Sequence, residues 1–516
     1  MKHTQTILIA VLAALIAGLP CYVFAEIIPS WMFGDHMVLQ RDMPIPVWGT
    51  AETGERVTVE LDGRRESATT DNRGRWRVTL GPLATGGPYT MTVSGDNTVT
   101  FTDILAGEVW LCSGQSNMWW SVGHERDIPP EQAPRDVGDI RLISLYSPES
   151  EKFGSEPIWK QCTVDNLQDF SAVGWFFGRR LNEELGVPVG LIHSSMGGSL
   201  PEAWMRIDTL KADPLFRPII AYLDSLAVAH PDAAGKFAAW MEGTRRYRQE
   251  NGDPPENDIF SFLPKATRYY MRKPEGVYRA QLEPIIPFAI RGVIWYQGES
   301  SVDRAWQYRE LFPALIREWR GLWGQGDFPF IYVQLQNYGT NGTDPVNSLP
   351  ELREAQLMSL RVPNTAMAVT IDIGEKDVHA NNKWDMGTRL CLGALKVVYG
   401  RDIVASGPIY RGMKVENGMV RLTFDHTNGG LATPGNVDLT GFAVAGEDRV
   451  FHPAEARIEG NEVVVRNRDI AAPRAVRYGW DNNPSCNLYN DAGLPASPFR
   501  TDSWPGVTYG RVTPVN

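Results

Sequence analysis

The sequence has few cysteines, no excess of positive charge and only one long apolar run, and each shortage excludes a class of protein. Its 516 residues include five cysteines and no C-x-x-C pair, so no zinc site is predicted. A net charge of -11, from 50 basic and 61 acidic residues, argues against nucleic acid as a partner, because phosphate binders usually carry a basic surface. A hydrophobic share of 43% and a charged share of 22% indicate a globular chain.

The scattered cysteines leave the thiol or disulfide state of the chain open. Beyond the N-terminal segment, Cys112, Cys162, Cys391 and Cys486 lie far apart in the sequence. In an oxidising compartment one or two disulfides are compatible with them, although the sequence does not specify the pairing. Cys112 and Cys391 lie in apolar surroundings, which also suits buried thiols.

The one long apolar run, residues 7–19, lies at the N-terminus and follows Lys2 and His3. Residues 23–25 read VFA, which resembles a signal-peptidase site because small residues occupy its first and third positions. The run is short for a membrane-spanning helix, which favours cleavage after Ala25 over a retained anchor. We therefore expect a signal peptide over residues 1–25, a secreted protein that is periplasmic or extracellular, and no stable membrane insertion.

Length and patterning predict three folded regions after the signal peptide. Residues 26–106 carry short alternating runs separated by turn signals, which predicts an N-terminal β-sandwich. Residues 107–400 alternate strands with helices, the pattern of an α/β fold with a parallel sheet and helices on both faces. An insertion at about 205–285 is predicted to be a solvated helical segment, or alternatively a lid. Residues 401–516 return to alternation, which predicts a C-terminal β-sandwich region.

Both element types can be placed within the α/β region. The predicted helices cover residues 170–185, 303–323 and 381–399, and Gly186 ends the first of them. In a parallel sheet of this kind, ligands bind at the carboxyl ends of the strands. The predicted strands are approximately 109–112, 140–145, 187–193, 292–296, 328–335 and 366–373.

Four of these predicted strands end in polar or glycine-rich segments. The segments are residues 114–117, 194–199, 297–300 and 372–379. Because the carboxyl ends of parallel strands meet at one edge of the sheet, we expect the four segments to form one site. The alternative is that each is only the polar start of a loop.

The first of these segments carries the candidate nucleophile, Ser116. A glycine turn after a buried strand holds one hydroxyl exposed at the edge of the sheet. His379 is the candidate general base, because it alone among the histidines of the mature chain combines a strand end, a following helix and acidic neighbours. Asp377 would orient its imidazole, with Glu375 as the alternative.

Preorganised donors are needed for the oxyanion of such a reaction. Backbone N–H groups at Ser116 and at residues 197–198 would serve, and the side-chain amide of Gln297 would supply a third donor. Trp119 and Trp120 follow the nucleophile directly, where they would form either a sugar-stacking wall or part of the packing.

Several short motifs recur in order along the chain. They are residues 33–40 (FGDHMVLQ), 113–118 (SGQSNM), 197–199 (GGS) with 202–204 (EAW), 295–300 (WYQGES), 377–379 (DVH) and 494–501 (LPASPFRT). Together they resemble the sialate O-acetylesterase family of the SGNH/GDSL hydrolase superfamily, whose relatives include acetylesterases acting on plant hemicelluloses. The resemblance implies an SGNH-type, flavodoxin-like parallel sheet flanked by antiparallel β-sandwich regions.

The resemblance also implies a secreted carbohydrate O-acetylesterase that needs no metal or organic cofactor. Its partner would be an acetylated mono-, oligo- or polysaccharide, such as sialic acid, xylan or xyloglucan. Ser116 would form an acyl-serine while His379 takes its proton, and Gly198 and Gln297 would hold the oxyanion. The alternatives are a non-catalytic carbohydrate-binding protein on the same scaffold and a general short-chain esterase.

Two positions depart from the pattern of the superfamily. Gln297 lies in a block that replaces an asparagine-containing one. The superfamily usually places an aspartate three residues before the histidine, where this chain has Lys376, and Asp377 lies two before it. The third triad member is therefore Asp377, another carboxylate such as Glu299, or absent, as in a Ser–His dyad.

Overall fold

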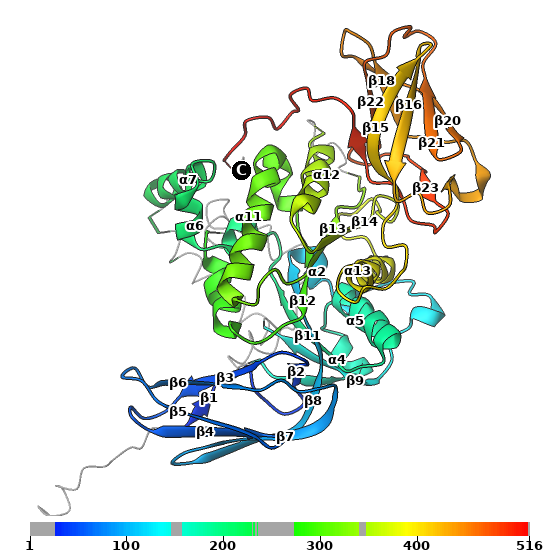
Figure 1. The fold of residues 1–516 in the computed structure, drawn as a ribbon. Helices are drawn as coiled ribbons and strands as arrows, with labels where there is room; N and C mark the ends of the chain where they lie inside the picture. The colour runs from blue at the N-terminus through cyan, green and yellow to red at the C-terminus, as the bar shows by residue number, and fades with distance from the viewer. Residues whose placement is uncertain are drawn as a thin grey trace, which may run out of the picture.

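The computed structural model describes residues 26–145, 157–229, 231–232, 235, 273–339 and 347–513. An N-terminal β region, a central α/β region and a C-terminal β region follow one another through the molecule (Figure 1). The predicted signal peptide, residues 1–25, lies outside the described residues, as does the part of the predicted insertion between residues 236 and 272.

Alternating strands form two sheets in the N-terminal region. One sheet has the order β1-β3-β6, and in β6 Trp76, Val78 and Leu80 are buried while the residues between them are exposed. This is the period of two that places successive side chains on opposite faces. The strands are β1 (Ile28–Pro29), β2 (Val38–Gln40), β3 (Ile45–Thr50), β4 (Arg56–Leu61), β5 (Arg64–Thr69), β6 (Arg75–Leu80) and β7 (Gly86–Ser94).

Strand β8 (Thr98–Gly114) belongs to both the N-terminal and the central regions. Its first part pairs antiparallel with β7, and its second part, from Glu108 to Gly114, pairs in parallel with β11. Burial along the strand changes from alternation to a continuous buried run, because the second part lies in a sheet that is covered on both faces. The predicted boundary between residues 106 and 107 thus falls inside one strand.

The central sheet has the order β10-β9-β11-β8-β12-β13-β14. All its pairings are parallel except that of β10 with β9. Every residue of β11, β12 and β13 is buried, as expected for parallel strands between two helical layers. The strands are β9 (Val137–Ser144), β10 (Lys160–Cys162), β11 (Val189–Ser195), β12 (Gly292–Tyr296), β13 (Phe330–Gln334) and β14 (Thr365–Val369).

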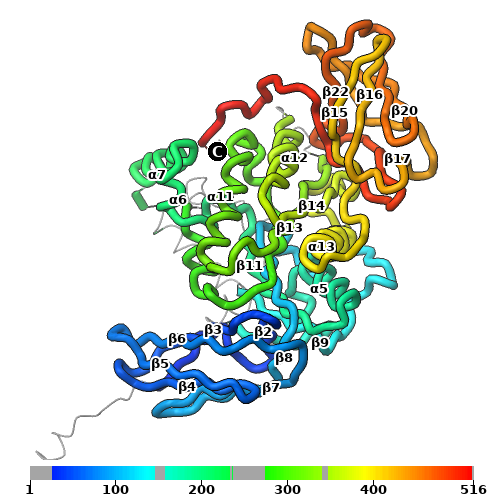
Figure 2. The backbone as a smooth tube through the Cα atoms, viewed as in Figure 1, coloured from blue at the N-terminus to red at the C-terminus, as the bar shows by residue number. Residues whose placement is uncertain are grey.

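Helices cover both faces of this sheet (Figures 1 and 2). On one face α5 (Ala172–Leu185) packs against α13 (Lys383–Val397), and its Phe177 ring lies 5.0 Å from that of Trp110 on β8. On the other face α11 (Ala305–Trp323) packs beside α12 (Leu349–Met358), and its Trp319 ring lies 5.5 Å from Trp295 of β12. The three helices predicted from periodicity are therefore confirmed.

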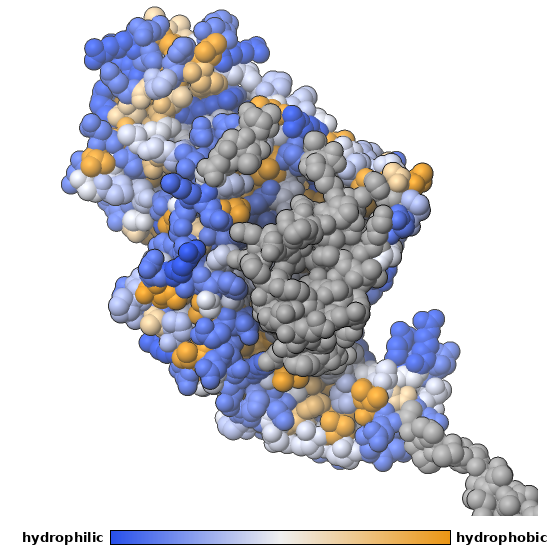
Figure 3. Space-filling model, turned by 180° about the vertical axis from the view of Figure 1, so that it is seen from behind, coloured by the Kyte–Doolittle hydropathy of each residue, from blue (hydrophilic) through white to orange (hydrophobic). Residues whose placement is uncertain are grey.

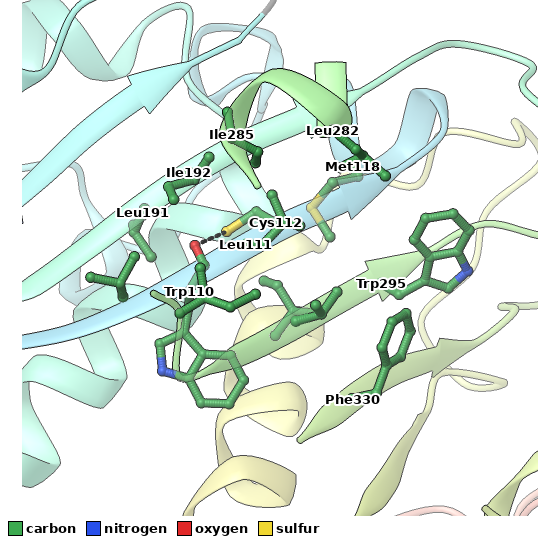
Figure 4. Packing of buried hydrophobic residues seen from close by; sticks show 14 of the residues in the cluster. Trp110, Leu111, Cys112, Met118, Leu191, Ile192, Leu282, Ile285, Trp295 and Phe330 are labelled. Atoms are coloured by element: carbon green, nitrogen blue, oxygen red, sulfur yellow. Dashed lines mark hydrogen bonds between the residues drawn. The ribbon is translucent and has the colours of Figure 1, made fainter. Parts of the chain in front are cut away.

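The buried residues of β8 lie at the centre of the core (Figure 4). Trp110, Leu111 and Cys112 have no exposed surface. None of the four cysteines predicted to be available for disulfides is paired: Cys112, Cys162, Cys391 and Cys486 are all free. Burial raises the pKa of each thiol, so they act as protonated packing residues.

Two four-stranded sheets pack face to face in the C-terminal region, in the orders β15-β16-β21-β20 and β19-β18-β22-β24. Residues such as Leu422, Val444 and Phe499 form their shared core. The strands are β15 (Ile409–Glu416), β16 (Met419–Asp425), β18 (Phe442–Ala445), β19 (Phe451–Pro453), β20 (Glu455–Glu459), β21 (Glu462–Arg466), β22 (Ala475–Tyr478) and β24 (Phe499–Arg500), with a small pair formed by β17 (Leu431–Ala432) and β23 (Tyr489–Asn490).

The C-terminal segment returns to the central region after β24 (Figure 2). Thr508 is fully buried, and its Oγ1 atom donates to Glu351 of α12 at 2.5 Å and accepts from the backbone N–H of Trp306 on α11 at 3.1 Å. These contacts attach the end of the chain to the helical layer that covers β12 and β13.

The predicted insertion begins with two helices, α6 (Ile207–Ala212) and α7 (Arg217–Ala229). Within the part of the chain that the structure describes, no helix combines the length and apolar character that a membrane span requires. The coloured surface in Figure 3 is mostly hydrophilic, with small scattered apolar areas, as is usual for a folded protein in water.

Candidate active site

A sharp turn at Gly114 places Ser116 at the end of β8. The φ angle of Gly114 is +142°, and a Cβ atom there would lie 2.0 Å from the carbonyl oxygen of Tyr296 on the neighbouring strand. Only glycine fits this approach. The N–H of Gln115 then donates to the same carbonyl at 2.9 Å, and Ser116 begins the short helix α2 (Ser116–Trp119).

The imidazole of His379 meets the Ser116 hydroxyl. The distance from His379 Nε2 to Ser116 Oγ is 2.9 Å, within the reach that proton transfer requires. Burial lowers the pKa of His379, and the nearby charge of Lys383 lowers it further. The imidazole is therefore neutral at neutral pH and available as an acceptor for the serine proton.

Asp377 is the carboxylate beside this imidazole, but its contact is loose. The Asp377 Oδ1 atom lies 3.4 Å from His379 Nδ1, and the aspartate side chain is 69% exposed. Its firmer hydrogen bond, at 2.8 Å, is to the backbone N–H of His379. Glu375, the alternative, accepts instead from the N–H and the side chain of Asn381.

Glu299 lies in the site without contacting the imidazole in any hydrogen bond of the described residues. It is partly buried, and its Oε1 atom accepts from Nδ2 of Asn117 at 2.5 Å. Burial raises the pKa of this carboxyl group. Glu299 therefore contacts the residue after Ser116 rather than the face of His379 that a triad acid would occupy.

The loop after β11 brings Gly198 toward the end of β8. Met196 N–H donates to the Gly114 carbonyl at 3.1 Å, and Gly198 adopts a φ of +64°. Across the described ranges, no acceptor takes the backbone N–H of Ser116 or of Gly198. Both groups are free to donate to a ligand.

The predicted third oxyanion donor, Gln297, has other partners in this structure. Its Nε2 atom donates to the Ser199 carbonyl at 3.2 Å and to Ser301 Oγ at 3.3 Å, and its Oε1 atom accepts from Tyr308 at 3.0 Å. The side chain is fully buried. One amide hydrogen is bonded to the Ser199 carbonyl and the other to the Ser301 hydroxyl, so Gln297 would have to exchange one bond to reach an oxyanion.

The two tryptophans after the nucleophile have different surroundings. Trp120 is buried and stacks on His379, with ring centroids 4.9 Å apart and planes 17° apart. Trp119 is partly exposed, and its ring lies 5.6 Å from that of the exposed His124. Trp120 thus packs against the base, whereas Trp119 retains surface that a ligand can contact.

Sequence reasoning missed the polar residues behind the candidate pair of Ser116 and His379. Lys383 and Asn117 are fully buried, and Lys383 Nζ donates to Asn117 Oδ1 at 2.8 Å. The one available signal was a lysine in the first turn of the helix after His379, where positive charge is disfavoured by the helix dipole. In the described part of the chain, no group of three or more histidine, cysteine, aspartate or glutamate side chains is arranged to hold a metal ion.

The chain is similar to known proteins in both sequence and structure. Residues 106–241 and 264–394 match the model of the family described as "Carbohydrate esterase, sialic acid-specific acetylesterase". Sialate O-acetylesterase of Mus musculus is 30% identical over 90% of this chain and 92% of its own, and that of Homo sapiens is 27% identical over 91% and 92%. The crystal structure of a carbohydrate acetylesterase from Xanthomonas citri has a TM-score of 0.77 and 35% identity, covering 93% of this chain and 100% of that one.

Proposed function

Because the chain belongs to the sialic acid-specific acetylesterase family of carbohydrate esterases and is a carboxylic ester hydrolase, we propose that it removes acetyl groups from sugars. We propose that the reaction passes through an acyl-serine intermediate. The observation that carries the proposal is the 2.9 Å distance between Ser116 Oγ and His379 Nε2. A serine hydroxyl is a weak nucleophile until a base takes its proton, and this distance allows that transfer.

The proposed reaction uses groups whose positions have been described. His379 accepts the proton from Ser116 as the serine oxygen attacks the acetyl carbonyl. The oxyanion that forms accepts hydrogen bonds from the N–H groups of Ser116 and Gly198, at the end of β8 and in the loop after β11. As the bond from the acetyl carbon to the sugar oxygen breaks, the imidazolium gives its proton to that oxygen, which leaves as a hydroxyl group. Water, activated by the same imidazole, hydrolyses the acyl-serine and releases acetate.

The orientation of the imidazole follows from its two neighbours. With Asp377 on the Nδ1 side at 3.4 Å, the proton of the neutral ring belongs on Nδ1, and Nε2 faces Ser116 with its lone pair. Asp377 is proposed as a weak third member of the triad. Gln297 is proposed as an additional oxyanion donor only when it releases Ser199 or Ser301.

The proposal includes the SGNH-type, flavodoxin-like arrangement of the sheet. Five of the strands lie in the order β11-β8-β12-β13-β14. Numbered by their order in the chain, they read 2-1-3-4-5, the doubly wound order in which ligands bind where the strand order reverses. In this chain the reversal lies between β8 and its two neighbours, where Ser116 is located.

The substrate class and the location of the protein are also part of the proposal. The relatives from Mus musculus and Homo sapiens are named sialate O-acetylesterases, and the relative from Xanthomonas citri is described as a carbohydrate acetylesterase. We propose an acetylated mono-, oligo- or polysaccharide as substrate, either an O-acetyl sialic acid or a hemicellulose. The apolar run and the VFA motif before residue 26 support secretion to the periplasm or the exterior.

The test of the proposed chemistry is acetate release by the purified protein and its Ser116→Ala variant. The wild type should hydrolyse an activated acetate ester, and Ser116→Ala should lose nearly all of this activity while its circular dichroism is unchanged. Ser113→Ala is the matched control, because the Ser113 hydroxyl is buried without a hydrogen-bond partner in the described structure and should be dispensable. Full activity in Ser116→Ala would overturn the mechanism.

The substrate is tested by comparing acetate release from O-acetyl sialic acid, acetylated xylan and acetylated xyloglucan oligosaccharides. A preference in kcat/KM for one sugar class over the small activated ester would identify the class. Equal rates on all esters would favour a general short-chain esterase, and sugar binding without acetate release would favour a binding protein.

A further inference from the structure

A buried lysine lies behind the proposed catalytic pair, although acyl transfer makes no use of it. Lys383 is the first residue of α13, and none of its surface is exposed. Enclosing an ammonium group away from water is unfavourable, and at the N-terminus of a helix the backbone dipole opposes positive charge as well. Locally unfavourable placements of this kind, such as a buried cation at a helix N-terminus, occur mainly at functional sites.

The ammonium group of Lys383 completes a closed set of hydrogen bonds around the proposed base. Its Nζ atom donates to Asn117 Oδ1 at 2.8 Å and to the carbonyl of Ala380. Nδ2 of Asn117 donates in turn to the carbonyl of Val378 at 3.0 Å. The carbonyl groups on both sides of the base are thereby held by one lysine and one asparagine, and the asparagine directly follows the proposed nucleophile.

We propose that Lys383 is a positioning residue for ester hydrolysis, which fixes the loop of His379 to the turn of Ser116 and places a positive charge beside the imidazole. The inference rests on the proposed roles of Ser116 and His379. Asp377 does not supply this restraint, because its side chain is 69% exposed and 3.4 Å from the ring. The loop is held instead by buried bonds to its backbone.

Two aromatic rings beside Lys383 also favour a cation at this position. Nζ of Lys383 lies 5.9 Å from the ring centroid of Trp120 and 5.8 Å from that of Tyr296, distances at which an ammonium is attracted to an aromatic face. Trp120 is the same ring that stacks on His379. The same indole therefore contacts both the lysine and the base.

Carboxylates from three segments face the ammonium group. They are Glu125 after α2, Glu299 after β12, and Glu375 with Asp377 before α13. Burial lowers the pKa of Lys383, and these carboxylates oppose that effect, Glu125 most strongly. The resulting pKa of about 8 leaves the lysine mostly cationic at neutral pH.

Charged and titratable groups lie around the imidazole of His379. Lys383 and His124 lower its pKa, and Asp377 raises it, while burial is the largest cause of the lowering. A cationic Lys383 thus favours the neutral ring, which is the form a general base requires.

The test compares Lys383→Met with a matched control on the same helix, Lys396→Met. Lys396 lies in the last turn of α13, is 47% exposed and has Nζ 3.5 Å from Asp402. Lys383→Met should lower kcat on an activated acetate ester by about tenfold or more, because misplacing a catalytic group is costly, with KM changed less than about twofold. In a plot of kcat/KM against pH, the fall in activity on the acid side (the acid limb) should move to higher pH by about half a unit or more. Lys396→Met should match the wild type in kcat and in the position of this acid limb.

The shift of the acid limb separates positioning and charge from a purely structural role. A lysine needed only for folding would reduce the amount of active enzyme and leave the acid limb of the remainder unchanged. Two results for Lys383→Met would overturn the proposal. One is a wild-type kcat with an unchanged acid limb. The other is an unchanged acid limb with a kcat reduced only in proportion to the fraction of protein that is folded.

A second variant keeps the proposal testable if Lys383→Met does not fold. Asn117→Ala removes the acceptor of the ammonium and the donor to Val378 but keeps the positive charge. It should lower kcat by about tenfold or more with the acid limb near that of the wild type, and a wild-type kcat would overturn the proposal. Ser116→Ala separates failure of the proposed function from failure of the role of Lys383. If Ser116→Ala stays active, the proposed function is wrong. If Ser116→Ala is inactive while Lys383→Met has wild-type activity, only the role of Lys383 is wrong.

Discussion

Nε2 of His379 lies 2.9 Å from Oγ of Ser116, although 263 positions separate the two residues in the chain. The contact exists because β8 and β14 end at the same edge of the parallel sheet. Gly114 turns the chain sharply after β8, and the loop after β14 returns over that turn before α13 begins. The parallel topology brings the segments of Ser116 and His379 to the same edge of the sheet, and the loops place the two side chains in contact.

The pH dependence of hydrolysis should reflect a base with a lowered pKa. Burial and the charge of Lys383 lower the pKa of His379 from its ordinary value, and the neutral ring is the form proposed to act as the base. Activity should therefore be constant through neutral pH and fall as the pH drops below about 6.5, the ordinary histidine value. A pH profile of kcat/KM on an activated acetate ester measures this, and an acid limb centred above that value would contradict it.

Removing Asp377 should have a modest effect, because its contact with His379 is exposed and long. We expect Asp377→Ala to lower kcat by less than about tenfold. Since this carboxylate raises the pKa of the histidine, its loss should also move the acid limb to lower pH. Glu299→Ala is the comparison: if neither variant lowers the rate by more than about tenfold, a Ser–His dyad is the better model.

A side chain at Gly114 should disrupt the nucleophile turn. Gly114→Ala would place Cβ 2.0 Å from a backbone oxygen at a φ of +142°, so we expect a loss of more than about 3 kcal/mol in the free energy of unfolding. Chemical denaturation with activity as a second signal measures it. Gly138→Ala in β9 is the control, because its added methyl group would meet nothing within 4 Å, and similar stabilities of the two variants would refute the prediction.

The ion pair between Glu202 and Arg304 should matter for stability, since both side chains are at most 1% exposed and the atoms lie 2.6 Å apart. Arg304→Met leaves the Glu202 carboxylate enclosed without this guanidinium, which should cost about 3–5 kcal/mol. In the exposed pair of Arg180 and Glu184 on α5, Arg180→Met should cost less than about 1 kcal/mol. Urea unfolding compares the two, and equal losses would contradict the role of burial.

Local patterns in the sequence were sufficient to predict the central elements. Residues 292–296 were predicted as a strand and form β12, because a short apolar run bounded by turn signals reads in the same way wherever it lies. The helix predicted at 303–323 is present as α11 and ends at Gly324, which adopts a left-handed conformation. These features depend on neighbours within a few positions, so one sequence is enough to identify them.

The limits of the regions were harder to predict than the elements. The change from alternating to continuous burial along β8 was visible in the sequence as a change of pattern near residue 107, and it was interpreted as a boundary between domains. The structure shows one strand that leaves one sheet and enters another. The pattern of apolar residues indicates how many faces of a strand are covered. It does not indicate whether the strand ends where the pattern changes.

The sequence by itself determined that a glycine turn, a loop with two glycines and a histidine loop follow strands of one parallel sheet, because strand period, turn residues and helix ends are local properties. Tertiary structure alone decided that Asp377 is exposed, that Gln297 holds Ser199, and that Lys383 and Asn117 close hydrogen bonds around His379. Those outcomes depend on which buried groups meet across more than two hundred positions of chain. Each buried donor must find an acceptor in the assembled core, and no local pattern specifies which one.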